Sequence, residues 1–121
     1  MEIVELEHRK LLPQVLEAMY PDKSERENII HKLSEYGKES YQVEKERVHM
    51  GILYLTSKSP ETIDENISLA CCDFRDLLVA AEYPLSFGKD KLKEKNPEKY
   101  RSLELKEQEQ YYEWLESLKI A

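Results

Sequence analysis

The fold of this chain is decided by the stretch Ser59 to Pro84, which reads SPETIDENISLACCDFRDLLVAAEYP. It opens on a serine that can cap free backbone amides and a proline whose fixed φ suits the first turn of a helix. Its apolar residues recur at steps of three and four, the spacing of one helix face: Ile63, Ile67, Ala70, Phe74, Leu77, Leu78 and Ala81. A helix is expected to stop at Tyr83-Pro84. The stretch predicts one helix, or a closely spaced pair if Cys72-Asp73 begins a second one.

The first helix is expected near the N-terminus, where Pro13 limits its start. A proline inside a helix removes one hydrogen bond and clashes with the carbonyl four residues earlier, so it is tolerated best in the first turn. We therefore expect the helix to begin near Arg9 or Lys10, and residues 2–8 to form a short arm packed on the body. A kinked helix from residue 2 is the alternative.

Two further helices are expected between residues 24 and 57. The segment Ser24–Glu27 is typical of a capping box, in which a serine and a glutamate satisfy free amides at a helix start. Gly37 stands where a left-handed residue would end that helix. One long bent helix over the same residues is the alternative. The last helix is expected to open at Asn96-Pro97, after a connection over residues 84–97.

Composition agrees with a helical protein. The chain has 20 Glu against five Asp, and only three Gly and five Pro, so residues that favour helices outnumber those that favour turns. At 121 residues one domain is expected. The sequence therefore predicts an all-α domain over residues 1–121, a compact bundle of four or five helices with a short N-terminal arm. Its core is expected where the central apolar stripe packs against Val15, Leu33, Ile52 and Leu115.

The charge balance disfavours several classes of partner. The formal net charge is −7, which argues against non-specific nucleic-acid binding and against an anionic membrane surface. No apolar run approaches the roughly 20 residues of a membrane-spanning helix, and the first ten residues are acidic where a signal peptide would be basic. The adjacent Cys71 and Cys72 offer neither a disulfide framework nor metal-ligand spacing. We expect a protein of the reducing cytoplasm.

A di-metal site is the sharpest enzymatic hypothesis. Helical bundles that hold two metals use Glu-x-x-His motifs, and this chain has two, Glu5–His8 and Glu46–His49. Glu46 and His49 are the candidate ligands, with Glu5, His8 or Glu107 completing the site. Against it, the first motif precedes Pro13, and the central stripe supplies no carboxylate. We therefore expect no cofactor or metal, and interpret His49 as a residue at the edge of an apolar face.

The remaining candidate chemistry is also given a structural interpretation. His31 lies off the apolar line of its helix and is expected to face solvent. Cys71 and Cys72 lack a histidine partner and are expected to be small buried residues. No phosphate-binding loop, nucleophile elbow or zinc spacing occurs in the sequence.

Exposed charged and aromatic residues are the candidates for an interaction site. Arg75 and Asp76 lie beside the central stripe, where they could face a partner; alternatively Asp76 favours a helix N-terminus and Arg75 pairs with a carboxylate such as Glu46. Tyr83 and Phe87 lie near the long connection. Tyr111 and Tyr112 point about 100° apart on a helix, so one of the two, Tyr112 in our prediction, is a candidate for exposure.

A resemblance covers residues 46–84. The segments Glu46–His49, Ile52–Leu55, Asp73–Leu78 and Ala81–Pro84 resemble small, uncharacterised bacterial proteins in which an Asp-aromatic-Arg-Asp helix ends in Glu-Tyr-Pro. The resemblance implies a bacterial cytoplasmic origin. It implies no activity and no functional residues.

The sequence thus favours a non-catalytic protein–protein interaction module, with a homodimer as one form of that interaction. The first alternative is a metal-dependent helical-bundle enzyme that uses Glu46 and His49. The second is an antitoxin-like or immunity-like protein, whose acidic surface would neutralise a basic partner.

Overall fold

All regular structure in the described part of the chain, residues 2–120 of the computed structural model, is helical. The elements, in order, are the 3₁₀ turn η1 (Ile3–Glu5), α1 (His8–Met19), α2 (Lys23–Leu33), α3 (Lys45–Lys58), the 3₁₀ turn η2 (Pro60–Thr62), α4 (Ile63–Cys72), α5 (Phe74–Glu82), α6 (Asp90–Lys95) and α7 (Pro97–Ser117). The all-α prediction is confirmed. The expected number of helices is too low, because seven α-helices lie within these residues.

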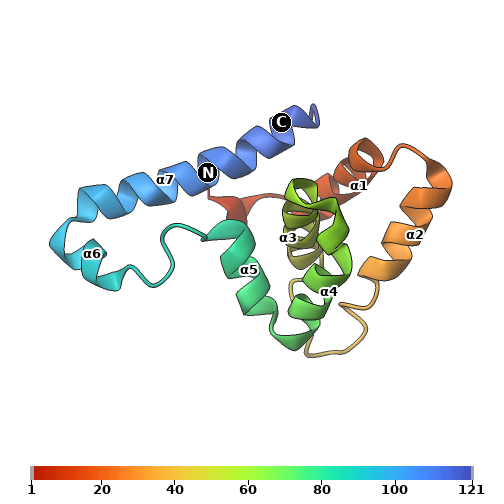
Figure 1. Cartoon of the computed structure of the whole chain (residues 1–121), viewed down its shortest axis with the longest axis horizontal. Helices are drawn as coiled ribbons and strands as arrows, with labels where there is room; N and C mark the ends of the chain where they lie inside the picture. Colours follow the sequence, from red (N-terminus) through yellow and green to blue (C-terminus); the bar gives the residue numbers. More distant parts are fainter. Residues whose placement is uncertain (1, 121) are drawn as a thin grey trace.

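Helix α3 is the centre of the fold and packs against α1, α4 and α5 (Figure 1). Its buried residues run all round the helix: Val48, His49, Met50, Gly51, Ile52, Leu53, Tyr54 and Thr56. A helix that is apolar on every side is stable only when neighbours cover it. The closest approach is at Gly51, where an added Cβ would lie 2.8 Å from Leu77 Cδ1 of α5. The glycine therefore sets the spacing of α3 and α5.

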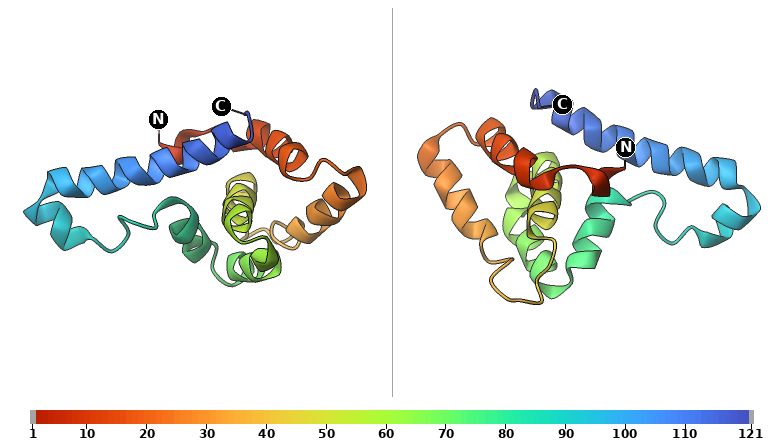
Figure 2. Two further views of the ribbon diagram at one scale, coloured as in Figure 1. Left: turned by 45° about the horizontal axis from the view of Figure 1, so that its top comes forward. Right: turned by 180° about the vertical axis from the view of Figure 1, so that it is seen from behind.

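Helix α7 lies along the body with one half and extends beyond it with the other (Figures 1 and 2). All of its buried residues lie in the C-terminal half: Glu107, Tyr111, Trp114 and Leu115. Tyr111 and Trp114 pack against Tyr54 of α3, with ring centroids 5.0 and 5.2 Å from the Tyr54 ring. The N-terminal half has no buried residue and packs against α6. We call α6 together with residues 97–106 the α6–α7 arm.

The central stretch forms a pair of helices, one of the two predicted arrangements. Helix α4 ends at Cys72, and α5 begins at Phe74. Asp73 between them is extended, and its carboxylate accepts a hydrogen bond from the amide of Arg75 at 3.0 Å. The aspartate is thus the N-cap of α5, which lets the chain turn while the apolar stripe continues. Ile63, Ile67, Ala70, Leu77, Leu78 and Ala81 of this stripe are buried.

The start of α2 differs from the prediction. Asp22 caps the helix by accepting a hydrogen bond from the amide of Glu25 at 2.9 Å, and Ser24 already lies inside the helix. The predicted capping box at Ser24–Glu27 is therefore wrong by two residues, because a carboxylate two positions earlier caps the same amides. The predicted division of residues 24–57 into two helices is confirmed, since residues 34–44 between α2 and α3 are not helical.

The two ends of the chain largely follow the predictions. Helix α1 begins at His8, so Pro13 is its sixth residue rather than part of the first turn. The N-terminal arm contains η1 and buries Ile3, while Val4 stays exposed. At the start of α7, Asn96 accepts a hydrogen bond from the amide of Lys99 at 3.1 Å and Pro97 is the first helical residue, as predicted. The connection before it contains the short helix α6.

None of the helices between residues 2 and 120 combines the length and the apolar character needed to cross a membrane.

Candidate functional site

An open groove of about 660 Å³ lies between α5 and the α6–α7 arm. We call it the α5–α7 groove. Helix α5 contributes Phe74, Arg75, Leu78 and Val79 to its lining. The loop after α5 contributes Tyr83, Ser86, Phe87 and Gly88, the arm contributes Asp90 and Tyr100, and Arg47 reaches it from α3. Three residues that the sequence predicts for interaction, Arg75, Tyr83 and Phe87, therefore line one hollow.

Helix α5 has apolar side chains on two faces. Leu77 and Ala81 are buried against α3, where Gly51 allows close packing. Phe74 and Val79 are partly buried and line the groove together with Leu78. One helix thus contributes to the core with one face and leaves apolar side chains on the other face next to the groove. The α5–α7 groove is therefore lined on this side mainly by apolar side chains.

The loop that carries Phe87 is fixed in place by Glu107 of α7. The Glu107 side chain is buried and accepts hydrogen bonds from the amide of Leu85 at 2.7 Å, from the amide of Ser86, and from the Ser86 hydroxyl at 2.8 Å. These bonds satisfy donors that would otherwise be buried without partners. Phe87 nevertheless is 67% exposed, so the loop is anchored while its aromatic side chain stays uncovered. This arrangement holds an apolar side chain at the rim of the groove.

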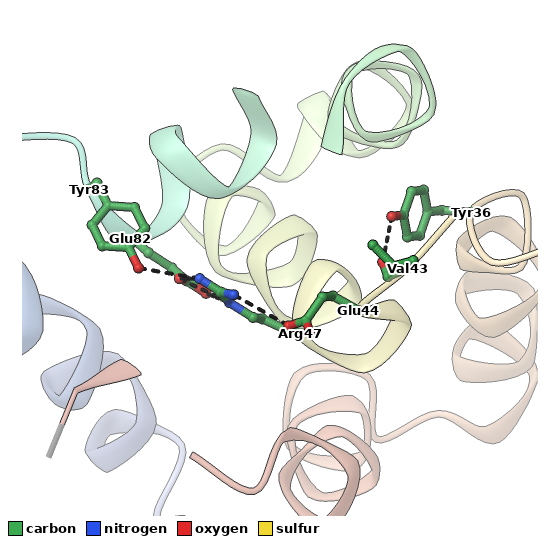
Figure 3. Close-up of polar contacts among 6 residues, drawn as sticks. All are labelled: Tyr36, Val43, Glu44, Arg47, Glu82 and Tyr83. Carbon is green, nitrogen blue, oxygen red and sulfur yellow. Dashed lines mark hydrogen bonds and ion pairs between the residues drawn. The ribbon is translucent and has the colours of Figure 1, made fainter. Parts of the chain in front are cut away.

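Arg47 links α3 to the end of α5 beside the groove (Figure 3). Its guanidinium donates to both carboxylate oxygens of Glu82, with Nε at 3.1 and 3.0 Å from them. It also donates to Glu44 Oε2 and to the Tyr83 hydroxyl, each at 3.3 Å. Hydrogen bonds to Glu82 raise the pKa of Arg47 above its ordinary value, against the opposing effect of burial. The cluster keeps a buried charge paired and positions the Tyr83 ring in the groove.

The proposed metal ligands lie apart from this groove. His49 is buried, with Nε2 2.9 Å from the carbonyl oxygen of Tyr36, so its expected place at the edge of an apolar face is wrong. Burial lowers the pKa of His49, which favours the neutral ring. Glu46 is half-buried. Among residues 2–120 no group of three or more His, Cys, Asp and Glu side chains is arranged to hold a metal ion.

The other motif is similarly divided between structural roles. His8 is buried as the first residue of α1, and burial followed by the charge of Arg47 lowers its pKa. Its Nε2 has no hydrogen-bond partner among the described residues. Glu5 ends η1 and is exposed. Glu107, the remaining candidate ligand, is engaged by the loop donors.

Two interaction candidates lie outside the groove lining. Asp76 is exposed in the first turn of α5, and Tyr112 is half-buried on α7. Arg75 pairs with Asp73, its Nε 3.2 Å from Oδ1, rather than with Glu46 as the alternative interpretation suggested. Asp73 and Arg75 are only two residues apart, so the local geometry at the start of α5 brings their side chains together.

The cysteines differ from the prediction as well. Cys71 and Cys72 are both exposed, although the sequence predicts that they are buried. They lie at the end of α4, where the chain leaves the core before turning at Asp73. The stripe that reaches the core passes through Ala70 instead. His31 is exposed as expected.

Arg47 and Glu82 are not among the site residues that the sequence predicts. One signal could have found them, because Glu82 follows Leu78 by one helical turn and so lies on an apolar face of α5. A carboxylate at such a position needs a cationic partner. What the pattern of α5 cannot provide is the position of that partner, 35 residues earlier in the chain.

Comparison with known proteins finds no matching family model, no matching curated protein and no matching solved structure.

Proposed function

We propose that this protein is a non-catalytic binding module that holds a helical segment of another protein in the α5–α7 groove. The observation that carries the proposal is the apolar groove lining, with Leu78 and Val79 on one wall and the largely exposed Phe87 on a loop anchored by Glu107. Aromatic residues in well-formed hollows are the usual anchors of protein interfaces.

The absence of strands within residues 2–120 supports a helical occupant. An extended segment binds best by adding a strand to a sheet edge, and these residues provide no such edge. The lining residues come from helices and a loop, so the groove offers no row of unpaired strand amides and carbonyls to an occupant. An α-helix satisfies its own backbone and presents apolar residues at spacings of three and four, so it suits such a surface.

The polar groups beside the groove support binding rather than chemistry. Arg47 is engaged by Glu82 and Glu44, and Glu107 by the loop amides and the Ser86 hydroxyl. Each of these groups holds a wall of the groove in position. A catalytic group needs access to its substrate, which side chains already engaged in such pairs do not offer.

The concave shape supports a different protein as the occupant rather than a second copy. In a two-fold symmetric dimer the same patch meets itself, so it must be self-complementary. A hollow facing an identical hollow encloses empty space. The large exposed apolar side chains of α2 and α7 are Ile30, which lies beside a separate hollow with Leu12 and Leu16, and Leu105, so neither helix offers an exposed apolar face to fill the groove.

Site-specific photo-crosslinking tests the proposal. A photoreactive phenylalanine analogue replaces Phe87 in the full chain, expressed in cells of its source, and a matched variant carries the same analogue at the exposed Ile30 of α2. We expect a discrete adduct with one other protein from position 87 and not from position 30. An adduct with the mass of two copies would identify a homodimer instead. Equal crosslinking at both positions, or none at position 87, would overturn the proposal.

A further inference from the structure

The segment that forms the outer wall of the groove is basic in an otherwise acidic chain. Residues 84–99 contain five Lys against Asp90, Glu94 and Glu98, whereas the whole chain has a net charge of −7. These lysines, at positions 89, 91, 93, 95 and 99, are all exposed. The sequence predicts a connection over residues 84–97, and the structure places this segment on one side of the α5–α7 groove.

Two of the lysines lie next to the groove lining. Lys89 stands between Gly88 and Asp90, which both line the groove. The Lys93 ammonium lies 5.4 Å from the centroid of the Tyr100 ring, and Tyr100 is also a lining residue. Within the described residues, the ion pairs involve none of the five lysines of this segment. The outer wall therefore has cationic groups that no carboxylate in this part of the chain pairs with.

The opposite wall has a more balanced charge. Arg75 is the cation of α5 at the groove, and its side chain is 76% exposed. Arg75 donates hydrogen bonds from Nε and one terminal nitrogen to the Asp73 carboxylate. A second carboxylate, Asp76, follows Arg75 directly in the helix. The wall formed by α5 thus has little net charge. The charged lining residue of the α6–α7 arm is Asp90, so the charge preference of the groove depends on the lysines that flank the lining, chiefly Lys89 and Lys93.

We infer that the helix bound in the groove is acidic, with Asp or Glu residues along the edge that faces α6 and apolar residues facing α5. The inference rests on the proposed function and adds the chemistry of its partner. At physiological ionic strength charges more than about 8 Å apart are largely screened. The lysines beside the groove, rather than the net charge of −7, therefore select the occupant. This is the opposite of the basic partner that belongs to the antitoxin-like alternative.

Selection from a random peptide library tests the inference while the natural partner is still unidentified. The full-length protein is the target for displayed 16-residue peptides of random sequence, and each enriched peptide is then measured for binding to the Phe87→Ser variant. We expect enriched sequences with apolar residues at i, i+3 or i+4 and i+7, with an excess of Asp and Glu, and at least tenfold weaker binding to F87S.

The outcomes separate the two proposals. Enriched peptides that depend on Phe87 but are neutral or basic would overturn the acidic partner and leave the proposed function standing. No enrichment over an immobilised control protein, or peptides that bind F87S equally well, would overturn both.

Charge reversal provides the matched control. In the double variant K89E/K93E we expect the enriched acidic peptides to bind about tenfold more weakly at low salt, with a smaller difference at 0.5 M salt. The double variant K10E/K23E changes the net charge equally at exposed positions of α1 and α2, away from the α6–α7 arm, and should leave binding unchanged within about twofold. Equal weakening in both variants would show that net charge, and not the arm, sets the preference. Melting curves of both variants check that each is folded.

Discussion

Arg47, in the first turn of α3, and Glu82, the last residue of α5, form a bidentate ion pair. The Glu82 side chain is fully buried, and the Arg47 side chain is 15% exposed. Two helices separated by 35 residues in sequence are thereby joined at the edge of the α5–α7 groove (Figure 3). The pair is surrounded by Glu44 and the Tyr83 hydroxyl, which take up further donors of the guanidinium.

Removing one member of this pair should cost far more than removing both. The Arg47→Met variant leaves the Glu82 carboxylate buried without a cation, and we expect it to lose about 3–5 kcal/mol of unfolding free energy. The double variant R47M/E82L removes both charges and should recover at least half of that loss. Chemical denaturation of the single and double variants measures the coupling. Losses that simply add would contradict a direct pairing.

The loop below Phe87 should depend on Glu107. In the Glu107→Ala variant the amides of Leu85 and Ser86 lose their acceptor, and unsatisfied buried donors cost about 1–3 kcal/mol each. We expect a loss of about 2–4 kcal/mol in unfolding free energy and much faster hydrogen exchange at both amides. Glu104→Ala, which removes the pair between the half-buried Glu104 and the exposed Arg101, is the control and should change stability by less than about 1 kcal/mol. Unchanged exchange at residues 85 and 86 would rule out this anchoring role.

Stability should fall as the solution becomes acidic. Burial lowers the pKa of both His49 and His8 below the ordinary value of 6.5. The charge of Lys45 lowers the pKa of His49 further, and the charge of Arg47 does the same at His8, while Glu46 raises both pKa values. The unfolded chain therefore binds these protons at higher pH than the folded one, so stability is complete above about pH 6.5 and declines as the pH falls below it. Titration of the two rings by NMR checks the assignment. Midpoints at or above 6.5 would contradict it.

Adding one methyl group at Gly51 should destabilise the core. The Cβ of an alanine would lie 2.8 Å from Leu77 Cδ1 and 3.3 Å from the Ala81 Cβ. Overpacking typically costs about 1–3 kcal/mol, and the better helix propensity of alanine returns about 1 kcal/mol, so we expect a net loss of about 1 kcal/mol. Combining Gly51→Ala with Leu77→Val relieves the shorter contact, so the pair should be less destabilised than the sum of the two single variants. Chemical denaturation of the two single variants and the double variant measures their unfolding free energies and completes a double-mutant cycle.

The parts of the fold that were predictable rest on local signals. The steps of three and four from Ile63 to Ala81 predicted the helices that cover α3, and Asn96-Pro97 predicted the start of α7. Local signals fail where two candidates compete, as when Asp22 rather than Ser24 caps α2. Local signals also do not show which way side chains point where two helices meet. The pattern therefore predicts that Cys71 and Cys72 are buried, whereas the turn at Asp73 leaves both exposed to solvent.

The candidate site was predictable only in part, for a related reason. Exposed aromatic residues near a connection pointed to Tyr83 and Phe87, which do line the groove. The long-range pairs that hold its walls, Arg47 with Glu82 and Glu107 with the loop at Ser86, depend on the tertiary arrangement. Periodicity along one helix contains no information about which distant helix supplies the partner.

The buried contacts of α7 all lie at its inner end, so its outer part projects from the body as a free beam. From Glu107, the first buried residue of α7, to Pro97 at the outer end is about 15 Å of helix at 1.5 Å per residue. A tilt of about 5° at Glu107 would therefore move the outer end, together with α6, by about 1 Å. Because Glu107 also fixes the loop that carries Phe87, such a tilt would move the outer wall of the groove while the aromatic rim keeps its place.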